Sequence, residues 1–151
     1  PLWSAITEAY TKNDYGWIKN VIGRMHQLWM MLLVFTILMV LAADKVYILW
    51  IGSEIKIPFS LNIAAALYVV ISTYGSIYMM FLNGVGKLRI QLIGTVLAGI
   101  IFIPLSFFLS ELLGVSGVMF AGALCVFVYV ILSPVQYKKI INKTARGIWN
   151  I

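Results

Sequence analysis

The chain has 151 residues, of which 62% are hydrophobic and 11% are charged, and its mean hydropathy is +0.99. A soluble domain is about half apolar and about a quarter charged, so this composition excludes a freely soluble globule. The net charge of +6 does not indicate nucleic-acid binding, because the basic residues stand between apolar runs and form no cluster. Cys125 is the only cysteine, which excludes an intrachain disulfide.

The first 24 residues come before any apolar run of membrane length. Residues 17–25 place apolar side chains at helical spacing on one face and Lys19 and Arg24 on the other, which predicts a short helix at the membrane interface. Asp14 is suited to cap the start of this helix. Residues 1–10 look like the end of a preceding helix. We therefore assign residues 1–24 to the end of a preceding helix and a cytoplasmic interfacial helix.

Four stretches of the chain have membrane length and contain no Asp, Glu, Lys or Arg. They are residues 26–43, 59–82, 90–109 and 115–135. As helices that rise 1.5 Å per residue, they are long enough to cross about 30 Å of hydrocarbon. The connectors are residues 44–58, 83–89 and 110–114, and the last two are short enough to make neighbouring spans antiparallel. The sequence predicts an all-α, polytopic transmembrane helix bundle over residues 25–136, followed by a basic cytoplasmic tail over residues 137–151.

Lys and Arg are distributed unequally between the two sides of the predicted bundle. One side receives only Lys45 and Lys56. The other side receives nine, namely Lys12, Lys19, Arg24, Lys87, Arg89, Lys138, Lys139, Lys143 and Arg146. Basic residues near the ends of spans are retained in the cytoplasm, so this bias predicts that both ends of the chain are cytoplasmic. The basic tail is then expected to lie on the anionic leaflet.

The residue inventory does not suggest catalysis. The chain has one histidine, no acidic residue in the middle of a span and no cysteine pair, so we expect neither an enzyme nor a metal or cofactor site. His26 beside Gln27, at the start of a span, is interpreted as an interfacial polar residue. The stretch from Gly84 to Lys87 lacks the spacing of a phosphate-binding loop and is interpreted as a glycine turn.

Two sets of polar residues are candidates for contact with a polar cargo. Neutral residues within or beside the spans are suited to line a wet cavity that accepts sugars; they are Asn62, Thr73, Tyr74, Tyr78, Asn83 and Gln91. Hydrogen bonds to neighbouring helices explain them equally. Three bases near the predicted cytoplasmic mouth are gate candidates for an anionic head group; they are Lys19, Arg24 and Lys87. Membrane orientation alone also explains these bases.

Three stretches together resemble one protein family. They are PLWSAITEAYTKNDYGWIKN at residues 1–20, VYILWIG at 46–52 and FLNGVGKLRIQ at 81–91. The first is similar to the end of the eighth helix and the cytoplasmic helix after it in polysaccharide biosynthesis proteins of the O-antigen, or lipid-linked oligosaccharide, flippase type. The second is similar to the periplasmic LWxG turn of that family, and the third to its cytoplasmic NGxGKxxxQ connection. These flippases belong to the multidrug/oligosaccharidyl-lipid/polysaccharide exporter superfamily.

The resemblance implies a protein of about twelve helices in two lobes that alternate access, of which this chain is most of the C-terminal lobe. It implies flipping of an undecaprenyl-pyrophosphate-linked oligosaccharide across the bacterial inner membrane for O-antigen or capsule export. The expected partners are the lipid bilayer, the polyprenyl-pyrophosphate-linked glycan and the missing N-terminal lobe, with no nucleic acid. A multidrug or small-molecule exporter of the same fold and a non-transporting membrane scaffold subunit are the alternatives.

Overall fold

The computed structural model describes residues 2–53 and 56–151, so Pro1, Glu54 and Ile55 lie outside the described residues. The elements in chain order are α1 (Leu2–Thr11), α2 (Tyr15–Trp50), α3 (Phe59–Val85), α4 (Arg89–Leu113), α5 (Val115–Ile141) and the short 3-10 helix η1 (Gly147–Asn150). Within the described part of the chain there is no β-strand, and α2, α3, α4 and α5 are long and apolar enough to cross a membrane. The predicted all-α transmembrane bundle is confirmed.

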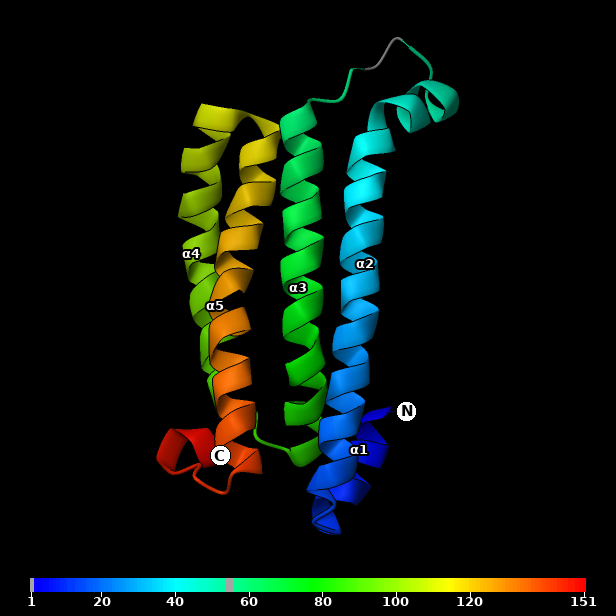
Figure 1. The fold of residues 1–151 in the computed structure, drawn as a ribbon. Helices are drawn as coiled ribbons and strands as arrows, with labels where there is room; N and C mark the ends of the chain where they lie inside the picture. Colours follow the sequence, from blue (N-terminus) through cyan, green and yellow to red (C-terminus); the bar gives the residue numbers. More distant parts are fainter. Residues whose placement is uncertain (1, 54–55) are drawn as a thin grey trace.

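The four long helices form an open row in the order α2, α3, α5, α4 (Figure 1). α3 packs against both α2 and α5, whereas α2 and α4 occupy the two edges of the row. Successive helices run in opposite directions. Both ends of the chain and the α3–α4 turn therefore lie at one end of the row, which we call the termini end (Figure 1). The opposite end, with the α2–α3 connection and the α4–α5 turn, is called the loop end.

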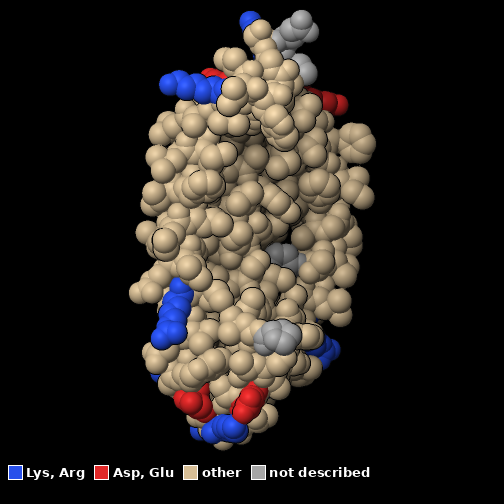
Figure 2. Space-filling model, turned by 90° about the vertical axis from the view of Figure 1, so that its right-hand side faces the viewer, with Lys and Arg blue, Asp and Glu red and all other residues tan. Residues whose placement is uncertain are grey.

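The outer surface of the long helices is apolar. Leu41, Leu92 and Phe107 are 74%, 66% and 70% exposed. Figure 2 shows charged side chains gathered at the two ends of one face, with a broad uncharged stretch between them. Water would not tolerate so much contiguous apolar surface, whereas hydrocarbon solvates it. The chain is a multi-pass membrane protein.

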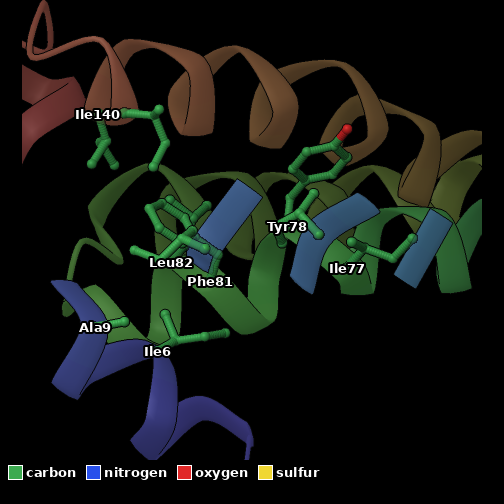
Figure 3. Packing of buried hydrophobic residues seen from close by; sticks show 10 residues of the cluster. Ile6, Ala9, Ile77, Tyr78, Phe81, Leu82 and Ile140 are labelled. Carbon is green, nitrogen blue, oxygen red and sulfur yellow. The ribbon is translucent and has the colours of Figure 1, made fainter. Parts of the chain in front are cut away.

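Bulky buried side chains gather at the termini end. Figure 3 shows Ile6 of α1, Phe81 and Leu82 of α3 and Ile140 of α5 within this core. The complete core is Ile6, Ala9, Ile18, Ile22, Ile77, Tyr78, Phe81, Leu82, Ile140 and Ile141. Because four helices contribute to it, this core joins α1, α2, α3 and α5 into one packed unit.

Small and polar residues hold the loop end together. The buried side chains there include Ala43 and Ala64. Hydrogen bonds join Ser60 to Ser116 at 2.8 Å and the Tyr47 hydroxyl to Oδ1 of Asn62 at 2.7 Å. In lipid, helices associate through close packing of small residues and through such hydrogen bonds, since burial of apolar surface gives little advantage. The two ends of the row are thus stabilised by different interactions.

The N-terminal half differs from the prediction in one respect. The predicted interfacial helix, the first span and the start of the 44–58 connector form one continuous helix, α2, of 36 residues. Its length is about 54 Å at 1.5 Å per residue. From Arg24 to Trp50 the sequence has no Gly or Pro to interrupt the backbone hydrogen bonds, and the last turns of α2 bend away from the row (Figure 1). The predicted cap is confirmed, since Asp14 Oδ1 accepts a hydrogen bond from the Trp17 backbone nitrogen at 2.9 Å.

The C-terminal half differs in its α4–α5 connection and in its tail. Only Gly114, at φ +61°, separates α4 from α5 where a loop over residues 110–114 is predicted. The helices approach so closely that a Cβ atom on Gly117 would collide with the backbone carbonyl of Leu109. α5 continues to Ile141, and η1 then folds back onto α4 and α5, so residues 137–151 are a folded segment. The tail is folded because it contacts α4 and α5, and local composition does not encode contacts of this kind.

Candidate functional site

His26 bridges α2 and α3 near the termini end. Its Nδ1 lies 2.8 Å from the carbonyl oxygen of Ile22, one turn earlier on α2. A carbonyl oxygen only accepts hydrogen bonds, so Nδ1 carries the proton and Nε2 is left with a lone pair. The Tyr78 hydroxyl, 2.9 Å from Nε2, therefore donates to it. The two hydrogen bonds fix both the ring orientation and the tautomer of His26.

Aromatic rings extend the His26–Tyr78 pair over three helices. The ring of Tyr74 lies edge-on to His26 and Trp29, with centroid separations of 5.6 and 5.1 Å. The ring of Tyr78 lies 5.4 Å from that of Tyr137 on α5. Edge-to-face contacts of this kind are favourable for aromatic rings. We call His26, Trp29, Tyr74, Tyr78 and Tyr137 the aromatic cluster.

The aromatic cluster is the best candidate for a functional site in the described part of the chain. An ionisable side chain in a membrane-spanning helix is expensive to bury and therefore marks a functional site by default. His26 is such a residue, and its Nε2 accepts a hydrogen bond from the hydroxyl of Tyr78, a residue that is only 7% exposed. The cluster also offers phenol hydroxyls and ring faces near the end of the span.

Only some of the predicted cavity residues come together. Tyr74 and Tyr78 lie in the aromatic cluster, where they contact His26. Asn62 is 16 residues from Tyr78 on the same helix, a separation of about 24 Å along its axis. It lines a different feature, a groove of about 360 Å³ between α2 and α3 at the loop end. The predicted set therefore does not line one common cavity.

The remaining cavity candidates are dispersed. The Thr73 hydroxyl donates to the carbonyl oxygen of Val69 at 2.6 Å, within its own helix. Asn83 is exposed at the end of α3, and Gln91 is half-buried on α4. The Thr73 hydroxyl is therefore satisfied within α3, and not by a neighbouring helix as the alternative explanation has it.

The gate candidates divide into two groups. Lys19 and Arg24 are exposed on α2, with no hydrogen bond or ion pair to the rest of the described chain. Lys87 is half-buried, and its Nζ donates to the backbone oxygen of Asn150 at 3.1 Å and to the side-chain oxygen of the same residue. Lys19 and Arg24 are thus available to an anionic head group, whereas Lys87 holds the C-terminal segment.

The glycine turn from Gly84 to Lys87 is a junction between helices. Thr7 of α1 donates its hydroxyl hydrogen to the Gly84 carbonyl oxygen at 2.7 Å. A Cβ atom on Gly84 would lie 2.8 Å from Cγ2 of Ile6, so only glycine allows α1 to approach this closely. Gly86 adopts φ +72° and ends α3 in the left-handed conformation. The turn therefore positions α1 and directs the chain into α4.

Sequence reasoning missed the contacts that anchor the C-terminal segment. Gln136 on α5 is fully buried, and its Nε2 donates to the carbonyl oxygens of Lys87 at 3.2 Å and Trp149 at 3.4 Å. The Lys139 ammonium lies 4.1 Å from the centroid of the Trp149 ring, a cation–π contact. The backbone nitrogen of Arg89 donates to the Ile151 carbonyl at 3.3 Å. A buried glutamine in an apolar helix is the one signal that could have revealed this anchor.

The pKa values of three titratable side chains on α1 and just after it are shifted by their neighbours or by burial. Lys12 Nζ lies 2.6 Å from Oε1 of Glu8 one turn away, and this hydrogen-bonded ammonium lowers the pKa of the Glu8 carboxyl. The same contact raises the pKa of Lys12. Partial burial raises the pKa of Tyr10, and the neighbouring Tyr15 contributes a smaller effect in the same direction. The ion pair is fully exposed and contributes little to stability.

The described residues contain no group of three or more His, Cys, Asp or Glu side chains that could hold a metal ion. What they do provide is a polar aromatic cluster within the span, exposed bases on α2 and a glycine junction at the termini end. Compared with known proteins, the chain matches no protein-family model, no curated protein and no solved structure.

Proposed function

We propose that this chain is part of a transporter that flips an undecaprenyl-pyrophosphate-linked oligosaccharide across the bacterial inner membrane for O-antigen or capsule export. The support comes from the position of the three stretches that resemble the flippase family. Residues 46–52 form the end of α2 and the bend at Gly52, at the loop end. Residues 81–91 form the α3–α4 turn at the termini end. The two stretches thus lie at opposite ends of the row, which fits a resemblance that assigns one to the periplasm and the other to the cytoplasm.

The described part of the first stretch supports the same arrangement. It forms α1 and the start of α2, and it packs directly on the α3–α4 turn through the hydrogen bond from Thr7 to Gly84. Two stretches that are distant in sequence and assigned to the same side by the resemblance are therefore in contact. The observation that carries the proposal is this contact.

The packing contrast between the two ends suits a transporter that alternates access. The core around Phe81 and Leu82 makes the termini end one packed unit. The loop end depends on small residues and on hydrogen bonds such as that between Ser60 and Ser116. A unit that is packed at both ends, by bulky side chains at one and by small residues at the other, can rock as a rigid body against a second lobe while keeping its fold.

The bases on α2 suit the cargo that we propose. A pyrophosphate–sugar head group is costly to desolvate, so a flippase has to offer it polar partners and positive charge. Lys19 and Arg24 are exposed near the termini end, which the excess of Lys and Arg assigns to the cytoplasm. We infer that they meet the head group before it reaches the phenol hydroxyls of Tyr74 and Tyr78.

Flux measurements in proteoliposomes test the function. The complete protein that carries this chain is reconstituted with an undecaprenyl-pyrophosphate-linked saccharide bearing a fluorophore, and a membrane-impermeant reductant reports the fraction in the outer leaflet. The proposal predicts that the protein accelerates exchange between leaflets. Replacement of Arg24 by Ala should slow it while insertion remains normal. The matched control is Lys138→Ala, which removes an exposed base at the same end.

Each alternative predicts a different result. Transport of a cationic dye without movement of the lipid-linked saccharide would favour the multidrug exporter. Movement of neither compound would favour the non-transporting scaffold. Equal flux in Arg24→Ala and Lys138→Ala would remove the role proposed for Arg24.

A further inference from the structure

α2 and α3 enclose a groove at the loop end whose shape fits a hydrocarbon chain. Its volume is about 360 Å³, and its lining is mostly aliphatic and aromatic. Along α2 the lining extends from Leu32 to Tyr47, a length of about 22 Å at 1.5 Å per residue. One leaflet of the hydrocarbon core is about 15 Å thick, so the groove can hold one lipid tail along its whole depth. The groove also reaches a polar side chain at its end, which an ordinary boundary between helix and lipid lacks.

That polar side chain is Asn62. It is only 6% exposed, and its Oδ1 accepts a hydrogen bond from the Tyr47 hydroxyl at 2.7 Å. Its Nδ2 has no hydrogen-bond partner among residues 2–53 and 56–151. With Oδ1 bonded to the Tyr47 hydroxyl, the two N–H groups of the amide are the part of this side chain that lacks a partner. Asn62 is the fourth residue of α3, about 4.5 Å inside the helix start. A buried donor at this depth requires an acceptor.

A polar pocket continues the groove toward the water. Its volume is about 350 Å³, and it shares Tyr47 with the groove. Asp44, Ser53 and Lys56 contribute the polar part of its lining. Asp44 and Lys56 form no ion pair with each other in the described structure. Among the described residues, the pocket therefore presents one negative and one positive group, which a ligand with both charges would complement.

We propose that the groove and the polar pocket together bind one molecule of diacyl phosphatidylethanolamine. One acyl chain lies in the groove, and its ester carbonyl accepts the hydrogen bond from Asn62 Nδ2. The phosphate faces Lys56, and the ammonium faces Asp44. Along the site, an apolar groove is followed by an amide donor and then by two opposite charges. Along this lipid, an acyl chain is followed in the same order by an ester carbonyl and then by a phosphate and an ammonium group.

The same order disfavours a polyprenyl phosphate as the occupant. Such a lipid has no carbonyl between its tail and its phosphate, so Asn62 would keep an unpaired donor, and it has no cation for Asp44. The polar part of the lipid site lies at the loop end, far from Lys19 and Arg24, and only the inner end of the groove, at Leu32, comes near Trp29 of the aromatic cluster. Its existence does not depend on the proposed flippase activity.

Lipid retention measured by native mass spectrometry tests the site without any substitution. The complete protein in detergent is titrated with diester phosphatidylethanolamine and with its diether analogue, which lacks the carbonyl groups. We expect the diester to bind about 2- to 13-fold more tightly, the factor that corresponds to one neutral hydrogen bond. Equal binding of the two lipids by the natural protein would overturn the role of Asn62.

Variants then separate the parts of the site. Asn62→Leu should bind both lipids equally, at the level of the diether, while Gln27→Leu, an exposed amide on α2, should keep the preference for the diester. Asp44→Asn should lose the preference for phosphatidylethanolamine over phosphatidylglycerol. If Asn62→Leu does not fold, the comparison of the two lipids on the natural protein still tests the hydrogen bond to the ester carbonyl. Tighter retention of undecaprenyl phosphate than of the diester lipid would overturn the choice of occupant.

Discussion

The Tyr78 hydroxyl of α3 donates a hydrogen bond to Nε2 of His26 on α2, across 2.9 Å. The pair joins α2, at the edge of the row, to α3, in its interior, and Tyr78 is also part of the buried core at the termini end. Because Nδ1 of the same ring donates to the Ile22 carbonyl, both ring nitrogens are used by the protein. Among the described residues, Tyr78 is thus one of three whose side chains donate hydrogen bonds across the α2–α3 seam, beside Tyr47 to Asn62 and Trp29 to the Val70 carbonyl oxygen.

Replacement of Tyr78 by Phe should destabilise the protein. The substitution removes the donor and leaves the Nε2 lone pair unpaired in a buried seam, which costs about 1–3 kcal/mol of unfolding free energy. Unfolding of the purified protein by SDS titration measures the loss. Tyr68→Phe is the matched control, since Tyr68 is 37% exposed and lies on the same helix. Equal stability of the two variants would contradict the importance of the His26 contact.

Gly84→Ala should displace α1 from α3. The new Cβ atom would lie 2.8 Å from Ile6 Cγ2 and 3.0 Å from the Trp3 carbonyl oxygen, closer than van der Waals contact allows. Overpacking of this kind costs about 1–3 kcal/mol. Hydrogen exchange should become faster in Leu2–Thr11. Gly99→Ala, at a glycine with nothing within 4 Å, should leave this exchange unchanged and so provides the control.

Gly117→Ala should be more severe than Gly84→Ala. At Gly117 the added atom meets the backbone of Leu109, which cannot rotate away, whereas at Gly84 part of the contact is with a side chain. We expect a loss of about 3 kcal/mol or more, with separation of α4 from α5. Thermal unfolding in detergent compares the two variants. A milder effect at Gly117 would show that the α4–α5 approach is looser than the structure has it.

Gln136→Leu should release the C-terminal segment. The variant loses the hydrogen bonds from Nε2 to the Lys87 and Trp149 carbonyls while it keeps the side-chain volume. Hydrogen exchange over residues 146–151 should become faster, with little change in α3. Lys138→Met is the control, because Lys138 is an exposed neighbour on α5. Unchanged exchange in Gln136→Leu would mean that η1 packs without this anchor.

Cysteine labelling in intact cells should reveal the orientation. In a Cys125→Ala background, a membrane-impermeant maleimide is expected to label Lys56→Cys from outside and to spare Lys143→Cys until the membrane is permeabilised. The reason is the excess of Lys and Arg at the termini end, which is expected to retain that end in the cytoplasm. Labelling of Lys143→Cys in intact cells would reverse the orientation and remove the basis of the transport proposal.

The spans could be predicted because their signal is local. A run of about 20 uncharged residues has one stable solution in lipid, a helix that satisfies its own backbone hydrogen bonds. Asp14 as a cap and Gly86 in a turn follow from equally local chemistry. The candidate site was harder to predict from the sequence. Tyr74 and Tyr78 were singled out as polar residues, but their partner His26 lies on another helix, and no local pattern pairs them.

The sequence by itself determined that this chain crosses a membrane four times as helices, because hydrophobicity, span length and capping act within a few residues of each position. Only the tertiary structure decided which faces of these helices meet. It joined His26 to Tyr78, folded η1 back onto Gln136 and left Asn62 facing a groove. In lipid such choices depend on small residues, close backbone approach and single hydrogen bonds, and these interactions exist only once the helices are side by side.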